Sequence, residues 1–353
     1  MELATKLIPQ TVRNSVREAG PNLNHWYAVG WAKDFGLETV QPVTIWNQSI
    51  AVFRDSQGQF QALENACPHR GVELHRGRVK GCHLVCPYHG WEFNSQGACV
   101  QIPYLPSDQK LPPQRARSFP IQERYGIVWI FPGETELADQ IPLLSIPEFG
   151  QPGLLMIPIT GHFQAHFSIC NENTMDVFHG FLHEDLQGWF DPVLLTLEET
   201  ENAVLARYSV SYRGKMAKFL GLAEDARETT TLPITIEYHY PNYATSLEGI
   251  SSLYLMRLPV GPQESRSFAL FFFRVRLPQW LIQRLQPILV PLLRRFFLEK
   301  FLAQDRSMME SEQHNYDLNP QRHYAEINPA IIAIQRMTLR QYDRYLQKKA
   351  PAS

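Results

Sequence analysis

The sequence lacks several features that mark common classes of protein. Its formal net charge is −2 with 19% charged residues, so no basic stripe or acidic tail indicates a nucleic-acid partner. No internal repeat and no glycine fingerprint of a dinucleotide or phosphate site occurs, so we do not expect the chain to take electrons from NAD(P)H unaided. Small-molecule chemistry is therefore the expected class of function.

Cysteine is scarce, and its number is odd. The chain has five cysteines, and its first thirty residues carry no apolar core of the signal-peptide kind. Both observations favour a reducing, cytoplasmic location. Cys82, Cys99 and Cys170 are expected to be small, buried apolar side chains and not disulfide partners.

Long apolar runs are also missing, because no segment reaches the roughly 20 uninterrupted apolar residues of a membrane span. The nearest candidate is 277–302, which Arg and Glu interrupt and which Pro287 and Pro291 are expected to break. The pattern predicts a pair of short amphipathic helices covering a core, with an interfacial segment as the alternative. Membrane association is therefore not expected.

Two short loops carry the strongest signal in the sequence. Cys67-Pro-His69-Arg-Gly and Cys86-Pro-Tyr-His89-Gly-Trp stand sixteen residues apart. Each supplies one cysteine and one histidine, which is the ligand set of a Rieske [2Fe-2S] centre: two thiolates on one iron and two imidazoles on the other. Proline and glycine suit two tight loops that approach the cluster from both sides.

A structural zinc site with two cysteines and two histidines is the alternative for these four residues. Zinc sites usually draw one ligand type from each segment, as in C-x2-C and H-x3-H. Here each loop mixes the two types, which favours the Rieske centre.

The chain is long enough for two domains. Short apolar runs separated by Gly, Pro, Asn and Asp occupy 26–132 and predict a small antiparallel β domain with the cluster loops at strand ends. The remainder mixes longer strands with helices and predicts an α+β domain with a long antiparallel sheet. Helices are expected near 171–185, 279–315 and 328–347. The expected domains are 22–140 and 141–353, with 1–21 as an N-terminal extension.

A second candidate metal site lies in the stretch 171–183. If this stretch is a helix of about 100° per residue, Asn173, Asp176, His179 and His183 fall within an arc of roughly 120°. The two histidines are then one turn apart and can reach one metal ion. The same arc could be the solvated face of an ordinary amphipathic helix. A one-electron centre in the same chain needs an acceptor, which favours metal ligation.

A carboxylate from elsewhere should complete this site, because two histidines and one carboxylate form the facial triad of non-haem ferrous iron. Asp305 is the first candidate. On a helix it shares a face with Phe301 and other apolar residues, where a bare carboxylate is costly without a bound cation. The alternative is a surface acid paired with Arg306 or Lys300. Glu310 and Glu312 are the fallback ligands.

Together these motifs resemble the Rieske non-haem iron oxygenase family, specifically its large (α) subunits. The resemblance spans most of the chain, from Trp26-Tyr27-Ala28-Val29 through both cluster loops to Gln304-Asp305. Within the family the sequence is most similar to the branch of vanillate O-demethylases, pheophorbide a oxygenase and chlorophyllide a oxygenase, on the evidence of 100–103 and 123–129. The C-terminal membrane helices and further cysteines of the plant members are not found here, so no chlorophyll-pathway role is implied.

The resemblance implies a helix-grip-like catalytic domain and two cofactors. These are a [2Fe-2S] cluster on Cys67, His69, Cys86 and His89, and mononuclear Fe(II) on His179, His183 and Asp305. It further implies that Asp176 links this iron to the cluster ligand His89 of a neighbouring subunit, in a head-to-tail ring that we expect to be a homotrimer. Asn173 is expected to orient groups beside the iron. Many members place four residues between the iron histidines, whereas three intervene here.

The expected activity is that of an oxidoreductase. It activates O2 at mononuclear iron to hydroxylate or oxidatively dealkylate an apolar, cyclic substrate, as a mono- or dioxygenase. Electrons are expected from a separate ferredoxin or flavin reductase. Two other classes remain open: a Rieske-type electron carrier without oxygenase activity, and a zinc-stabilised structural protein. About three irons per chain indicate the oxygenase and about two the carrier, while the zinc protein would be colourless.

Overall fold

The computed structural model describes residues 16–184, 189–213, 229–275, 278–322 and 324–349. The chain forms two compact units. One comprises Asn22–Leu143, and the other comprises Leu144 onward together with the segment before Asn22. The predicted α+β class, with a small antiparallel β part and one long antiparallel sheet, is confirmed.

The smaller unit contains three small antiparallel sheets, ordered β1-β10-β9, β2-β3-β4 and β5-β6-β7-β8. Its strands are β1 Tyr27–Trp31, β2 Val40–Ile45, β3 Gln48–Arg54, β4 Phe60–Glu64, β5 Arg78–Lys80, β6 His83–Val85, β7 Glu92–Phe93, β8 Cys99–Gln101, β9 Ile121–Arg124 and β10 Ile127–Ile130. Trp46 and Asn47 both have positive φ values, 47° and 62°, in the two-residue turn between β2 and β3. Such turns match the twist of a hairpin and hold it in register.

The larger unit is built on one seven-stranded antiparallel sheet, ordered β11-β17-β16-β15-β14-β13-β12. Its strands are β11 Leu154–Phe163, β12 Trp189–Glu199, β13 Ala203–Tyr212, β14 Thr230–His239, β15 Asn242–Leu247, β16 Ser251–Gly261 and β17 Glu264–Arg274. Its helices are α2 Phe167–Met175, α5 Gln279–Leu293, α6 Glu299–Leu318 and α7 Pro329–Lys349, with a 3-10 turn, η4, at Phe178–His183 and a π turn, η5, at Arg294–Leu298.

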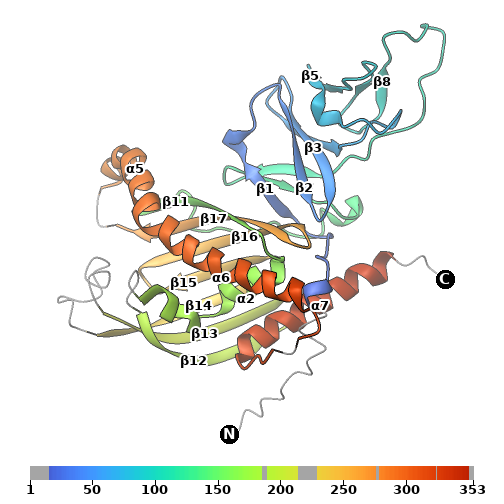
Figure 1. The fold of residues 1–353 in the computed structure, drawn as a ribbon. Coiled ribbons are helices and arrows are strands. Elements are labelled where there is room, and N and C mark those ends of the chain that lie inside the picture. The colour runs from blue at the N-terminus through green and yellow to red at the C-terminus, as the bar shows by residue number, and fades with distance from the viewer. Residues whose placement is uncertain (1–15, 185–188, 214–228, 276–277, 323, 350–353) are drawn as a thin grey trace. The chain divides into compact units, whose positions relative to one another are not determined.

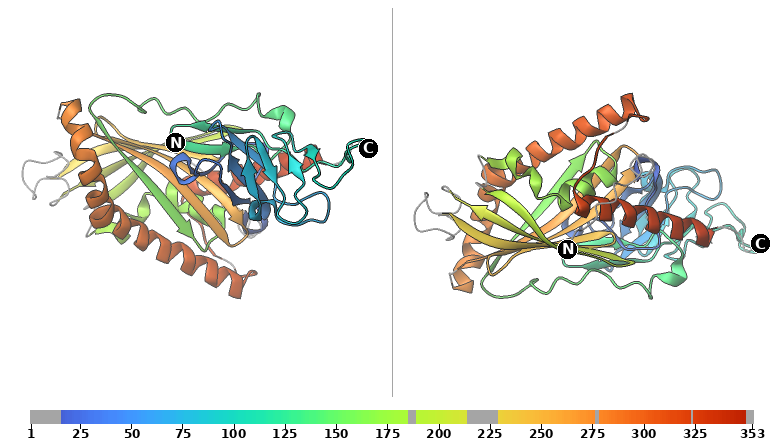
Figure 2. Two further views of the ribbon diagram at one scale, coloured as in Figure 1. Left: turned by 90° about the horizontal axis from the view of Figure 1, so that it is seen from above. Right: turned by 90° about the horizontal axis from the view of Figure 1, so that it is seen from below.

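Helices α2, α6 and α7 lie against one face of this sheet (Figures 1 and 2). Alternate residues of the central strands point toward them, including Tyr208, Tyr238 and Tyr243, which are fully buried. Helix α7 meets them with Ala330, Ala333, Ile334 and Met337, the i, i+3, i+4, i+7 spacing of an apolar helical stripe. The core of the unit therefore lies between the sheet and its helical layer.

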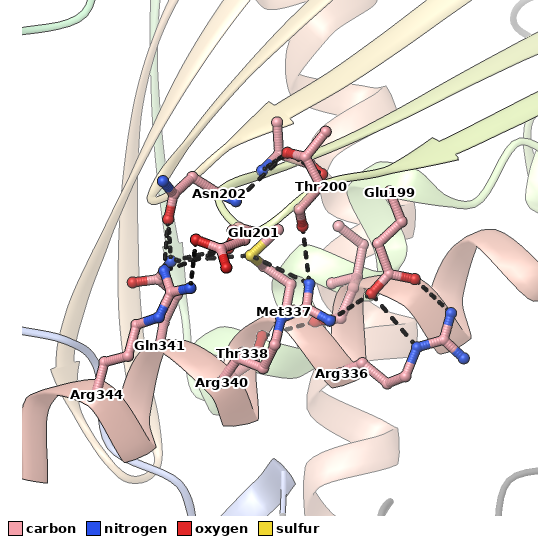
Figure 3. A network of polar contacts seen from close by, with 12 residues as sticks. Glu199, Thr200, Glu201, Asn202, Arg336, Met337, Thr338, Arg340, Gln341 and Arg344 are labelled. Carbon is pink, nitrogen blue, oxygen red and sulfur yellow. Dashed lines mark hydrogen bonds and ion pairs between the residues drawn. The ribbon is translucent and has the colours of Figure 1, made fainter. Parts of the chain in front are cut away.

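A polar network fastens α7 to the hairpin between β12 and β13 (Figure 3). Arg336 and Arg340 both pair with Glu199, the latter at 2.6 Å. Arg344 donates to the side chain of Asn202 at 2.7 Å. The network fixes the C-terminal helix beneath the edge of the sheet.

The predicted helix over 171–183 was wrong in its second half. Helix α2 ends at Met175, and Asp176 is extended, with φ −82° and ψ 114°. Its carboxylate accepts a hydrogen bond from the backbone N–H of Phe178 at 2.9 Å. An aspartate that bonds its own backbone two residues on competes with helix formation, so the chain turns here and continues as the 3-10 segment η4.

Three other expectations also differ from the structure. Strand β12 was not among the expected strands; it contains Pro192, whose missing N–H is tolerated because β12 is an edge strand. Helix α5 runs through Pro287 and Pro291 without a break, since both prolines face solvent, where water can bond the freed carbonyls. Cys82 is exposed in the turn between β5 and β6, although Cys99 and Cys170 are buried as expected. No described helix is long and apolar enough to cross a membrane.

Candidate metal centres and active site

The two cluster loops of the smaller unit have the same backbone design. The carbonyl of Cys67 accepts from the N–H of Gly71 at 2.7 Å, and that of Cys86 accepts from Gly90 at 3.2 Å. Both glycines have positive φ, 70° and 69°, a conformation that favours glycine. Each loop thus turns back on itself within five residues and presents its cysteine and histidine to one side.

The side chains of the two loops meet. The rings of His69 and His89 lie 4.8 Å apart, and the indole of Trp91 stacks on His69 at 4.7 Å. The Nδ1 atom of His89 is buried without a hydrogen-bond partner. A buried imidazole nitrogen in that position costs free energy unless it is ligated, so His89 fits a metal ligand.

The thiols of Cys67 and Cys86 are both buried. Burial raises the pKa of Cys67 to about 11, and a hydrogen bond with Cys86 acts in the same direction. The positive charge of iron beside such thiols converts them to thiolates. The donor set and its burial therefore fit an iron-sulfur cluster.

The candidate mononuclear site lies in the larger unit and joins two segments distant in sequence. His179 and His183 come from η4 and Asp305 from α6, and their ligand atoms all lie within 4.8 Å of one another. His183 Nε2 is 3.0 Å and His179 Nε2 3.7 Å from the same oxygen of Asp305. Among the described residues this is the one such group of three or more.

His183 is held in one orientation by its neighbours. Its Nδ1 donates to Oε1 of Gln304 at 2.9 Å, and the ring of Phe301 stacks on it at 3.8 Å. Because an amide oxygen only accepts, Nδ1 carries the proton and Nε2 turns its lone pair toward Asp305. In this tautomer Nε2 and the carboxylate oxygen are two acceptor atoms 3.0 Å apart, and a ferrous ion bound by both would satisfy them.

The other predicted residues of this site lie close by. Asn173 donates to Asp305 at 3.4 Å, and burial lowers the pKa of His179, which keeps its imidazole neutral and able to ligate. Asp176 accepts from the amide of Asn328 at 3.1 Å. The fallback ligands are engaged elsewhere: Glu310 accepts from the backbone of Gln164, and Glu312 pairs with Arg17.

Two residues of the site were not predicted to take part in it. Gln304 is one, although its place beside Asp305 could have marked it. Gly180 is the other: a Cβ built there would overlap the indole nitrogen of Trp189, whose ring lies 5.7 Å from that of His183. The glycine between the two histidines therefore lets Trp189 close the site.

A cavity of about 530 Å³ adjoins the triad. Strands β11 and β13 to β17, the α2 end and helices α5 and α6 enclose it, and His179, Asp305 and Asn173 form part of its wall. The rest of the wall is mostly apolar, including Ile157, Phe271, Leu293, Leu302 and similar residues. A pocket of this size and lining suits an apolar small molecule.

The arrangement separates two chemical tasks. Mononuclear ferrous iron, when bound by two imidazoles and one carboxylate, supplies open positions for oxygen and accepts single electrons. Asp305 and the two histidines would hold it at the cavity wall, and the apolar walls exclude water from the reacting carbon. The loop ligands of the smaller unit would hold the electron-transfer cluster.

Comparison with known proteins identifies the family. Residues 25–120 match the Rieske [2Fe-2S] domain, and residues 163–343 match the Vanillate O-demethylase oxygenase C-terminal domain. The 4beta-methylsterol monooxygenase of Methylococcus capsulatus is 33% identical over 344 residues, or 95% of this chain and 92% of that protein. The oxygenase component of dicamba O-demethylase from Stenotrophomonas maltophilia is 34% identical over 159 residues, 44% of this chain and 45% of that protein.

Solved structures share the fold. Dicamba monooxygenase bound to 3,6-dichlorosalicylic acid matches with a TM-score of 0.75 at 21% identity, covering 95% of this chain and all of that one. The expected cofactors, a Rieske cluster and a mononuclear iron, and the expected oxidoreductase activity are confirmed by the family, and the electron-carrier alternative finds no support. The chain belongs to the Rieske non-haem iron oxygenases, in the branch that carries the vanillate O-demethylase type of catalytic domain.

Proposed function

We propose that this oxygenase attacks a carbon, preferentially a methyl carbon, of a bulky polycyclic substrate of the sterol class. The observation that carries the proposal is the mostly apolar cavity of about 530 Å³ with His179 and Asp305 in its wall. The 33% identity to a 4beta-methylsterol monooxygenase over 95% of the chain supports the same class. His179, His183 and Asp305 are the proposed iron ligands, with Asn173 donating to Asp305.

One polar group in the cavity wall supports a substrate that also bears an oxygen. Arg257, on β16, is 4% exposed, and its Nε and Nη1 groups are buried without hydrogen-bond partners. Its Nη2 donates to the carbonyl of Cys170 and the hydroxyl of Thr174, both at 3.0 Å. Its guanidinium also lies over the ring of Phe163 at 5.5 Å. An oxygen substituent of the substrate would satisfy this buried cation.

The test is turnover of the reconstituted enzyme with an electron-donor system. We expect a 4-methylsterol to gain oxygen, detected by mass spectrometry, while a small aromatic acid is turned over poorly. Arg257→Met should raise KM for the hydroxylated sterol and leave the parent hydrocarbon unaffected, and iron content should remain at about three per chain. Rapid turnover of small aromatic acids with no reaction of sterols would contradict the proposed class.

We also infer that electrons arrive from a separate ferredoxin or flavin reductase and that the active form is a homotrimer. In this arrangement Asp176 of one subunit couples the iron to the cluster ligand His89 of the next. The position of Asp176 supports this role: it lies three residues before His179, and its carboxylate is fixed by bonds to Phe178 and Asn328.

Asp176→Asn tests the coupling, since it keeps the size of the side chain and removes its charge. Both metal sites should stay occupied, while reoxidation of a pre-reduced cluster by substrate and O2 should slow severely in a single turnover. Glu184→Gln, which removes a nearby exposed charge, is the control. A normal reoxidation rate in Asp176→Asn would rule out the coupling role and remove the main reason to expect the ring.

A further inference from the structure

Helix α5 presents an apolar face to solvent. Trp280, Ile288 and Leu292 are 64%, 62% and 47% exposed, and their spacing of eight and four residues places them within an arc of roughly 120°. Arg284, also exposed, lies on the same arc. Single exposed apolar residues are common, but a row of them along one helix marks an interaction surface.

The charge around this face is mainly positive. The segment 279–298, which covers α5 and η5, contains Arg284, Arg294 and Arg295 and no Asp or Glu. All three arginines are exposed. The first acid after them, Glu299, lies 3.9 Å from Arg294 as an ion pair, so three arginines and one glutamate leave 279–299 with a net charge of +2. The whole chain has a net charge of −2, so this local excess of positive charge is not a general property of its surface. A tryptophan, an apolar stripe and basic residues together are the pattern of helices that lie in a membrane interface.

The other side of the same helix belongs to the substrate cavity. Ile282 is 3% exposed, and Leu289, Leu293 and Leu298 line the cavity. One helix therefore has its inner face on the apolar binding site and its outer face on solvent. A ligand that leaves the cavity past α5 would emerge beside the exposed apolar row.

We propose that the outer face of α5 binds a lipid surface that carries anionic headgroups. The arginines complement such headgroups, and the apolar row would enter the boundary with the acyl chains. A second copy of this chain fits less well, because a two-fold contact through this face would bring like charges together. If the substrate belongs to the apolar class proposed above, the docked helix admits it from the lipid without passage through water.

The test is flotation of the purified, cluster-loaded protein with lipid vesicles in the absence of substrate. We expect binding to vesicles of phosphatidylcholine mixed with phosphatidylglycerol, weaker binding to phosphatidylcholine alone, and a loss of the difference at high salt. Arg284→Glu should weaken binding to the anionic vesicles by about tenfold. Trp280→Ser combined with Ile288→Ser should abolish binding to both kinds of vesicle.

Matched controls exist elsewhere in the chain. Leu292→Ser, in the face, should weaken vesicle binding. Leu346 on α7 is 44% exposed, close to the 47% of Leu292, so Leu346→Ser is its control and should bind as the unaltered protein does. Arg207 on β13 is an exposed arginine outside the face, and Arg207→Glu serves as the charge control. Visible absorbance of the cluster and the elution volume of each variant report folding and oligomeric state.

Three results would overturn the proposal. The first is that the unaltered protein does not float with either kind of vesicle. The second is that the face variants and the control variants lose binding equally. The third is that the face variants change their oligomeric state while their flotation stays the same, which would assign the face to a second copy. Because no substrate is present, these outcomes are independent of the proposed sterol activity. A protein that binds vesicles but oxidises no sterol would contradict the proposed function alone.

Discussion

His183 is constrained on three sides, and each contact has a separate effect on metal binding. Phe301 limits rotation of the ring, Asp305 is the carboxylate proposed to share the metal with it, and Gln304 fixes the tautomer that leaves Nε2 free. Residues that hydrogen-bond to a metal ligand commonly affect metal affinity strongly when they are replaced. At the scale of single residues, Gln304 is therefore as informative as the proposed ligands themselves.

Replacing Gln304 with Leu should lower the affinity of the mononuclear site for iron by about 10- to 100-fold. The buried Nδ1–H of His183 would lose its acceptor, and the ring would no longer be held in the ligating tautomer. Iron is measured by competition with a chelator, and the cluster absorbance should not change. Gln304→Glu retains an acceptor oxygen and should lose less; equal loss in both variants would assign the effect to packing.

His89→Cys tests the electron-transfer cluster. The variant should retain its iron but shift its reduction potential from the Rieske range toward about −400 mV, because a thiolate donates more charge to iron than an imidazole. Electrochemical or EPR titration measures the shift. His75→Cys, outside the two loops, should leave the potential unchanged, and an unaltered potential in His89→Cys would argue against ligation by this histidine.

At the scale of elements, the edge of the sheet and the C-terminal helix stabilise each other through charge. Although burial alone would raise the pKa of Glu199, its bonds to Arg336 and Arg340 outweigh that effect and hold the pKa below its usual value. A carboxylate with a lowered folded-state pKa stabilises the protein above its unfolded pKa of about 4.3. This contribution is lost as the pH falls through the folded-state value.

Glu199→Gln should therefore reduce the free energy of unfolding by about 1 kcal/mol at neutral pH. The difference from the unaltered protein should shrink as the pH falls below about 4. Denaturant unfolding at the two pH values measures both effects. Glu198→Gln, a change at the preceding exposed carboxylate, should cost little at either pH, and a Glu199 effect that persists in acid would show that charge is not its origin.

At the scale of the whole molecule, the two units have separate hydrophobic cores. The core of the smaller unit contains the cluster cysteines together with Phe53, Leu63 and Phe93. That of the larger unit lies between the seven-stranded sheet and α7. A ligand that binds one folded unit stabilises that unit. We therefore expect loss of the cluster to lower the stability of Asn22–Leu143 before that of the other unit.

Removal of cluster iron by a reductant and a chelator should lower the unfolding temperature of the smaller unit by several degrees and leave the other transition in place. Calorimetry resolves the transitions, and expressed Asn22–Leu143 provides the reference for the first. Selective removal of the mononuclear iron should move the second transition instead. A single transition that shifts as a whole would show that the units unfold together.

The sequence alone was sufficient for the features that depend on local chemistry. Each cluster loop is complete within a run of five to six residues and closes by its own backbone hydrogen bonds, so the sequence predicts Cys67, His69, Cys86 and His89 as one ligand set without knowledge of the fold. Local patterns likewise predicted the long antiparallel sheet and the helical stretches near 279–315 and 328–347, although the edge strand β12 was not predicted.

Tertiary structure decided the features that depend on distant contacts. Asp305 meets His183 across 122 residues of sequence, and Gln304 acquires its role only when α6 packs against η4. The break at Asp176 lies within a stretch whose residues were compatible with one helix; Asp176 has a local bond to the backbone of Phe178, and its bond to Asn328 across 152 residues holds the turn. Such long-range contacts depend on how the whole sheet and its helices pack, and no local sequence pattern records that packing.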